Sequence, residues 1–157
     1  MFSPIPAELQ VFIVSMSPVG ELRASIPLGI GFFNMSWQKA FAISFIGNTL
    51  SVTIVLLCLD KVSRYLSSRS KLFARFLEWL FDRTRKKYEK RFMIWKELAL
   101  LLFVAIPFPG TGGWTGALCA YLFGIPYKRS IPTISLGIFI AGVITTLCTI
   151  GVIKIVF

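Results

Sequence analysis

Long runs of apolar residues without a single charge limit this chain to folds that lie within a membrane. Phe41 to Leu59 is one such run, and Leu98 to Ala105 is another. The hydrocarbon of a bilayer accepts apolar side chains on every side of a helix, whereas water requires a polar surface. Of the 157 residues, 55% are hydrophobic and only 15% charged, which is too apolar for a soluble domain of this length. We therefore expect a multi-pass protein of the cell membrane that contacts membrane lipids.

Four apolar blocks follow one another along the sequence: Leu9 to Phe33, Lys39 to Leu59, Leu98 to Phe123 and Ser130 to Phe157. The second and fourth have the length of ordinary spanning helices, which need about 20 residues for a hydrocarbon core of roughly 30 Å. Both carry small residues suited to close helix packing, namely Gly47, Ser51, Gly137, Ala141 and Gly142. The sequence predicts an all-α integral membrane protein, a single membrane domain over residues 1–157.

The first and third blocks are interrupted. The first contains Pro18, Gly20, Glu21, Arg23, Pro27 and Gly29, and the third contains Pro107, Pro109, Gly110, Gly112, Gly113 and Gly116. A continuous helix is not expected through either, and lipid cannot satisfy the backbone groups that a break sets free. We predict re-entrant hairpins or discontinuous helices, shielded by protein and shaped by Pro18, Gly20, Pro27, Pro107 and Pro109.

An offset of 90 residues relates the two halves of the chain. It places Gly20 on Gly110, Trp37-Gln38-Lys39 on Tyr127-Lys128-Arg129, and Gly47 on Gly137. The pattern predicts two inverted repeats, residues 1–59 and 98–157, each a broken hairpin followed by a transmembrane helix. The alternative is four full spans, which would place Lys128 and Arg129 outside, against the tendency of basic residues to remain inside.

The segment between the repeats, residues 60–97, is basic. It holds 12 Lys and Arg against 5 Asp and Glu, a net charge of +7 of the chain's +10. Such a segment between apolar spans is retained in the cytoplasm, so its charge does not point to nucleic acid. It also predicts an amphipathic helix at the interface, with Phe73, Phe76, Leu77, Leu80 and Phe81 on one face and Lys71, Arg75, Glu78, Asp82 and Arg85 on the other.

Glu21 and Arg23 lie about a dozen residues inside the first block, where an unpaired charge costs at least ~2.5 kcal/mol. Residues two apart on a regular helix point in different directions, so the two meet only if the backbone is unwound; otherwise each needs a partner from another segment. In a functional interpretation Glu21 couples protons and Arg23 binds an anionic group. In a structural one the two charges only fix the hairpin.

The third block contains a run of glycines beside hydroxyl and indole side chains: Gly110, Thr111, Gly112, Gly113, Trp114, Thr115 and Gly116. A helix that begins near Thr115 would present its N-terminus to an anion at the membrane midplane. The run lacks the lysine and the spacing of a nucleotide-binding loop. Its alternative is a tight turn whose glycines allow a close helix crossing, with Trp114 simply packed.

The sequence contains few residues that could bind a metal or catalyse a reaction. The chain has no histidine, and Cys58, Cys119 and Cys148 each lie in an apolar run, where cysteine serves as a small apolar residue. We expect no metal, no cofactor and no disulfide. Since the apolar blocks also lack paired carboxylates, we do not expect an enzyme.

The two motifs, Ser17 to Ile30 and Val104 to Ala117, resemble the putative small multidrug export family of prokaryotic membrane proteins, as does Gly47-Asn48. Gly113 stands where that pattern has alanine. The resemblance covers nearly the whole chain outside its basic middle and implies export of small amphipathic compounds from a prokaryotic plasma membrane. The paired broken segments are also similar in architecture to the DedA group, which implies movement of lipid-linked phosphates.

The sequence thus predicts a proton-coupled transporter with a midplane site. The substrate would contact Arg23, Gly110, Thr111, Gly112, Gly113, Trp114 and Thr115, with Glu21 as the proton-coupling residue. Since four apolar blocks give little lateral shielding for two hairpins, we expect a homodimer. The alternative is a membrane assembly protein that transports nothing.

Overall fold

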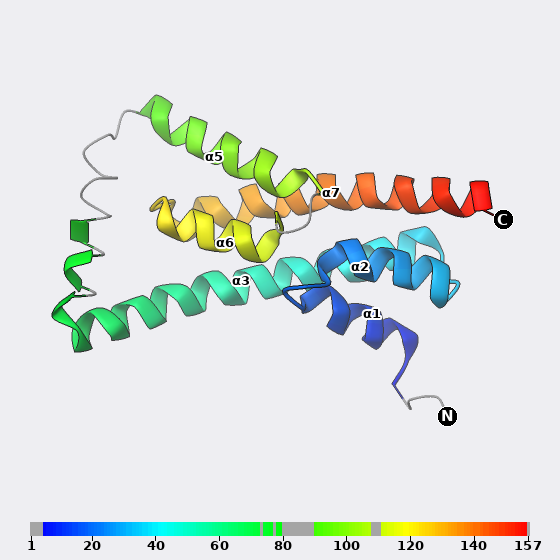
Figure 1. The fold of residues 1–157 in the computed structure, drawn as a ribbon, viewed down its shortest axis with the longest axis horizontal. Coiled ribbons are helices and arrows are strands. Elements are labelled where there is room, and N and C mark those ends of the chain that lie inside the picture. Colours follow the sequence, from blue (N-terminus) through cyan, green and yellow to red (C-terminus); the bar gives the residue numbers. More distant parts are fainter. Residues whose placement is uncertain (1–4, 73, 77, 80–89, 108–110, 157) are drawn as a thin grey trace.

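The computed structural model describes residues 5–72, 74–76, 78–79, 90–107 and 111–156, and every element assigned within them is helical (Figure 1). The predicted all-α fold is therefore confirmed. In chain order the elements are α1 (Ala7–Met16), α2 (Glu21–Pro27), the π-helical turn η1 (Leu28–Phe32), α3 (Trp37–Arg69), α5 (Lys90–Ala105), α6 (Gly113–Leu122) and α7 (Tyr127–Val156).

Two long apolar helices form the frame of the molecule. α3 has 33 residues and α7 has 30, and each contains a segment long and apolar enough to cross a membrane, Trp37–Tyr65 and Tyr127–Ile155. At about 1.5 Å per residue both exceed a hydrocarbon core of roughly 30 Å. They run in opposite directions and pack against each other (Figure 1). α3 continues past Leu59, so the first residues of the basic segment extend the same helix.

The first and third apolar blocks are broken, as their prolines and glycines predict. α1 and α2 form a helical hairpin that turns over residues 17–20, and α5 and α6 form a second one across residues 106–112. The two tips meet about halfway along α3 and α7, and the hairpins open toward opposite ends of the molecule (Figure 1). Pro27 is the last residue of α2, and the helical backbone continues from it into η1. The chain therefore does not reverse its direction at Pro27.

Glycines allow each long helix to approach closely the hairpin that precedes it in the chain. A Cβ at Gly47 on α3 would lie 2.0 Å from Oγ of Ser15 on α1, and one at Gly137 on α7 would lie 2.8 Å from Cβ of Val104 on α5. The predicted use of these glycines at helix crossings is confirmed. The core between the hairpins and the long helices is aliphatic, with Ile26, Val52, Leu100, Val104, Ile134 and Ile138 almost fully buried.

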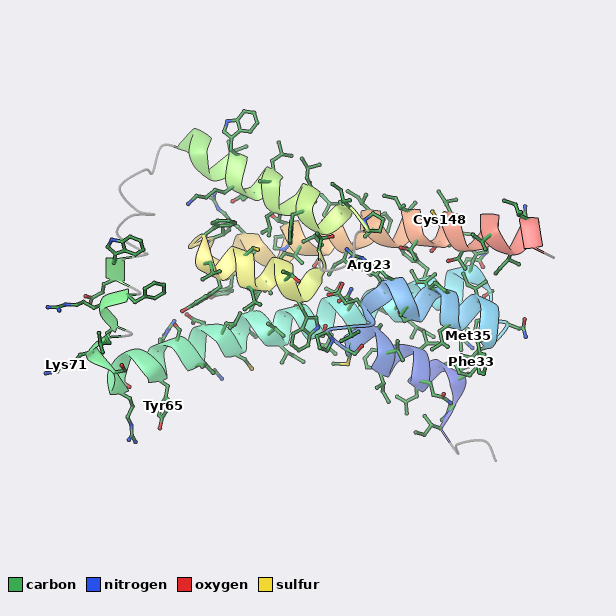
Figure 2. All side chains as sticks on the ribbon, in the orientation of Figure 1. Arg23, Phe33, Met35, Tyr65, Lys71 and Cys148 are labelled. Carbon is green, nitrogen blue, oxygen red and sulfur yellow. The ribbon has the colours of Figure 1, made fainter. Side chains whose placement is uncertain are left out.

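The described parts of the basic segment lie at one end of the molecule. Figure 2 shows Tyr65 and Lys71 there, and Phe33 and Met35 at the opposite end. The start of α7 is bound to α5 near that basic end, because Arg129 pairs with Glu97 at 3.3 Å. Of the predicted amphipathic helix, Phe76 is described and exposed. The rest of its apolar face, Phe73, Leu77, Leu80 and Phe81, lies outside the described residues, as do Asp82 and Arg85.

Candidate functional site

The tip of the first hairpin brings Glu21 into the interior. Ser17 holds the turn, because its hydroxyl oxygen accepts the N–H of Gly20 at 3.0 Å and its carbonyl accepts the N–H of Glu21 at 3.1 Å. Glu21 then begins α2 with φ of 47°, in the left-handed region that side-chain-bearing residues seldom adopt. Its side chain is buried, with 6% of the residue exposed. A strained backbone that buries a carboxylate is typical of functional sites.

The carboxylate of Glu21 lies at the N-terminus of α6. Its Oε1 accepts the backbone N–H of Trp114 at 3.2 Å, in the first turn of that helix. Gly112 leaves the space for it, since a Cβ there would lie 2.1 Å from Oε2 of Glu21. A helix N-terminus carries partial positive charge and unpaired N–H groups, which a carboxylate stabilises. The first hairpin thus supplies the cap for a helix of the second hairpin.

Arg23 reaches the same opposite hairpin from the first turn of α2. Its Nη2 donates to the carbonyl oxygen of Ile106 at 3.1 Å, to the backbone carbonyl of Thr111, and to Oγ1 of Thr111 at 3.3 Å. The Thr111 hydroxyl itself donates to Ile106 at 2.8 Å. In Figure 2, Arg23 lies near the middle of the molecule, where the hairpins meet. The guanidinium therefore bridges the break between α5 and α6.

Trp114 closes the contact between the tips from the other side. Its indole N–H donates to the carbonyl of Met16, the last residue of α1, at 3.2 Å. Glu21 and Arg23 thus each find a partner in another segment, which is the second of the two arrangements that their spacing allows. Together these bonds satisfy backbone groups at both helix breaks, as the interior of a membrane requires.

A pocket of about 530 Å³ opens where the two tips meet. Its lining combines the two charged residues with the turns of both hairpins and includes Gly20, Glu21, Arg23, Pro107, Gly112 and Thr115. This volume lies within the roughly 300–1,000 Å³ of small-molecule sites. A lining that mixes charged and polar groups with apolar ones is suited to an amphipathic ligand.

The predicted site residues divide into three groups. Arg23, Thr111 and Trp114 take part in the bonds between the hairpins, and Gly112 and Thr115 line the pocket with Glu21. Gly113 is the first residue of α6 but not part of the pocket lining, and a Cβ there would lie 2.6 Å from Val52 on α3. Pro109 and Gly110 lie outside the described residues. α6 begins at Gly113, two residues before Thr115, so the predicted helix start is confirmed, and the carboxylate at its N-terminus belongs to this chain.

Asn48 is a residue that the site analysis of the sequence did not single out. It lies in the middle of α3 with 1% exposed, and its Oδ1 would lie 3.2 Å from a Cβ at Gly113. Neither Oδ1 nor Nδ2 has a hydrogen-bond partner among the residues that the structure describes. The sequence does contain a signal that could have identified Asn48, namely a carboxamide inside an uncharged apolar run. Polar side chains at membrane depth are costly, so such a residue is expected to have a role.

The site offers no evident metal centre. Within the described ranges, no three His, Cys, Asp or Glu side chains gather into a group that could hold a metal ion. The chemistry available at the tips is ionic and hydrogen-bonding, from one carboxylate, one guanidinium and the N-terminus of α6.

Comparison with known proteins identifies one relationship. The model of a family described as "Putative small multi-drug export protein" matches residues 21–144, which include Glu21, Arg23, the tip of the second hairpin and most of α7. No curated protein and no solved structure matches the chain significantly.

Proposed function

Because the chain belongs to the putative small multi-drug export protein family, we propose that it is a membrane transporter that moves small amphipathic compounds through the pocket between its hairpin tips. The family description is that of an exporter and not of an enzyme. One observation carries the proposal: a buried Glu21 and a half-buried Arg23 line the same pocket, at the middle of the two long helices. Charges at such depth are costly and usually serve a ligand or an ion.

Arg23 is the substrate-binding residue in this proposal. A guanidinium presents a planar fork of N–H donors that fits carboxylates and phosphates. Gly112 and Thr115 lie in the same lining, where the Thr115 hydroxyl would donate a hydrogen bond to the anionic group. An anionic amphiphile, whether a drug-like compound or a lipid-linked phosphate, fits this arrangement.

Glu21 is the proton-coupling residue. Its carboxylate accepts the N–H of Trp114, and bonds to an ionised acceptor are roughly twice as strong as neutral ones. Protonation would therefore weaken the contact between the tip of the first hairpin and α6. Binding of a proton and opening of the pocket would be linked through this one bond.

We further propose that the halves are inverted repeats with re-entrant hairpins. The long helices begin at Trp37 and Tyr127, which are 90 residues apart. With the same offset, Gly47 and Gly137 pack against the first helix of their own hairpins. The hairpins extend from opposite ends toward the centre (Figure 1). This symmetry supports alternating access by movement of one hairpin against the other.

A homodimer would supply lateral shielding. α1, α2 and α6 have 10, 7 and 10 residues, which is too short to cross a bilayer. Helix ends at membrane depth need protein around them. A second copy that covers one side of the hairpins would provide it, and chemical crosslinking in vesicles would detect the pair.

A second candidate is a membrane assembly protein without transport activity. The bonds of Glu21 and Arg23 to the opposite hairpin favour it, because they explain both charges as parts of the fold. Buried charge pairs can fix a structure without any ligand.

Transport in proteoliposomes separates the two candidates. Purified protein would be reconstituted with fluorescent amphipathic anions and cations and with a polyprenyl-phosphate analogue, with and without a pH gradient. Glu21→Gln retains an oxygen that accepts the N–H of Trp114, and Arg23→Gln retains donors for the carbonyls. Glu8→Gln is the matched control, because Glu8 pairs with Lys39 at an exposed position on α1, away from the tips.

We expect anion movement driven by the gradient, loss of that dependence in Glu21→Gln, and a rate reduced about tenfold in Arg23→Gln, as for the loss of one charged hydrogen bond. Glu8→Gln should behave as the wild type. Well-folded protein that moves none of the probes would contradict the proposal. Reduced yield of the Glu21 and Arg23 variants without a transport defect would favour the assembly protein.

A further inference from the structure

We propose that the substrate is an anionic amphiphile with a hydrocarbon tail, and that the tail lies in a groove between the first hairpin and α7 while Arg23 holds the headgroup. The inference rests on the proposed function and specifies its class of substrate. It begins with a second hollow in the structure, next to the pocket at the hairpin tips.

The groove has a volume of about 520 Å³. Pro27 and Gly31 line it from the first hairpin, and Ile144, Cys148 and Val152 line it from α7. Arg23 and Pro107 line both the groove and the polar pocket, so the two spaces adjoin at these residues. Figure 2 shows Arg23 near the centre and Cys148 farther along α7 toward the C-terminus.

The walls of the groove suit a hydrocarbon tail. Its lining contains two hydroxyl side chains, but Thr145 donates to the carbonyl of Ala141 at 2.8 Å and Thr149 donates to that of Thr145 at 2.8 Å. These hydroxyls are satisfied within α7 and leave their methyl groups for the ligand. A hydrocarbon tail there would face apolar groups without leaving a buried polar group unpaired.

Charge selects the headgroup. Two charged residues lie at the tips. Glu21 lines only the pocket, whereas Arg23 lines both the pocket and the groove. The carbonyls of Ile106 and Thr111 that accept from Arg23 are neutral. An acidic headgroup carries the opposite full charge and can accept two parallel bonds from the fork, and so competes with these carbonyls for the guanidinium. A cationic headgroup would be repelled at the same point.

Gly31 provides a way to close the groove. A Cβ at Gly31 meets no atom within 4 Å, although the residue belongs to the lining. A large side chain there would occupy the groove without a clash in the core. Gly151 on α7 also has nothing within 4 Å of a Cβ and is absent from the groove lining. Gly31→Phe and Gly151→Phe therefore form a matched pair.

Photolabelling in vesicles of neutral phospholipid tests the site without transport. The full chain would be irradiated with a diazirine-bearing long-chain carboxylate, and labelled residues would be located by mass spectrometry. A quaternary ammonium with the same tail is the probe of opposite charge. We expect the carboxylate to label residues 144–153 of α7 about tenfold more than the ammonium, the factor for roughly 1.4 kcal/mol. Gly31→Phe should lose this labelling and Gly151→Phe should keep it.

Alkylation of Cys148 gives a second test that does not depend on Gly31→Phe. Cys148 is exposed in the groove, whereas Cys58 is exposed on α3 outside it. In chains with Cys119→Ala and one of these two cysteines, a bulky maleimide on Cys148 should prevent photolabelling, and one on Cys58 should not.

The outcomes separate this inference from the proposed function. Equal labelling by both probes, or labelling that survives both Gly31→Phe and a blocked Cys148, overturns the inference even if transport occurs. Selective labelling that these changes remove supports it, and if no probe then crosses the membrane, the transporter proposal alone fails.

Discussion

The carboxylate of Glu21 accepts the backbone N–H of Trp114 at 3.2 Å, across 93 residues of sequence. One hydrogen bond thus joins the start of α2 to the start of α6 and fixes the tips of two hairpins against each other. Arg23 and the indole of Trp114 add bonds in the same region, to Ile106 and to Met16. Proposed proton coupling and proposed substrate binding both depend on this contact.

Gly112→Ala should displace the Glu21 carboxylate with little backbone strain. Gly112 has an extended backbone, φ −122° and ψ −173°, which alanine adopts readily. Its new Cβ would lie 2.1 Å from Oε2 of Glu21, the end of a flexible side chain that can move away. We expect loss of gradient-driven transport and a loss of stability of about 1 kcal/mol from the missing cap. Transport and thermal unfolding in detergent would be measured on the same preparations. Transport at the wild-type rate would contradict a role for the carboxylate.

Trp114→Phe should weaken the contact between the tips. A phenyl ring retains part of the aromatic packing but fills less space than the indole, and the carbonyl of Met16 loses its donor at 3.2 Å. The expected loss is about 1–2 kcal/mol, since a polar group without its partner is costly inside protein. Denaturant or thermal unfolding in detergent provides the measurement, and an unchanged midpoint would show that the bond contributes nothing.

Gly47→Ala and Gly137→Ala should both destabilise the protein, since the proposed repeat gives them the same task. The new methyl groups would lie 2.0 Å from Oγ of Ser15 and 2.8 Å from Cβ of Val104. Each variant should lose about 1–3 kcal/mol, as overpacked interiors do. Gly151→Ala, with open space around it, should be neutral or stabilising by up to about 1 kcal/mol. Thermal unfolding compares the three, and a tolerant Gly137 would weaken the repeat.

Asn48→Leu should raise stability while it lowers transport. The amide of Asn48 is buried against Gly113 without a partner among the described residues, so an apolar side chain of similar shape removes a cost of about 1–3 kcal/mol. A polar group retained at that cost beside the start of α6 indicates use in the transport cycle. Unfolding and proteoliposome transport are both needed, and a destabilised variant would show that the amide is satisfied.

Local composition determined the membrane setting, the two long helices and the positions of both breaks. Uncharged runs such as Phe41 to Leu59 are more stable in the hydrocarbon of a bilayer than in water. In the other blocks Pro18, Gly20, Pro107 and Gly112 prevent a continuous helix. These effects act over a few residues and can be read along the chain. The family motif also followed from the sequence, because the residues that carry it are contiguous.

Tertiary structure alone decided what the charges at the breaks contact. Spacing left open whether Glu21 and Arg23 would meet each other or find other partners, and their partners lie in the second hairpin, at Trp114, Ile106 and Thr111. The N-terminus of α6 was predicted as a site for a foreign anion, yet a carboxylate of this chain occupies it. Burial of Asn48 against Gly113 likewise depends on how α3 crosses α6. Such contacts join residues far apart in sequence, and they are set by helix packing, which no local pattern records.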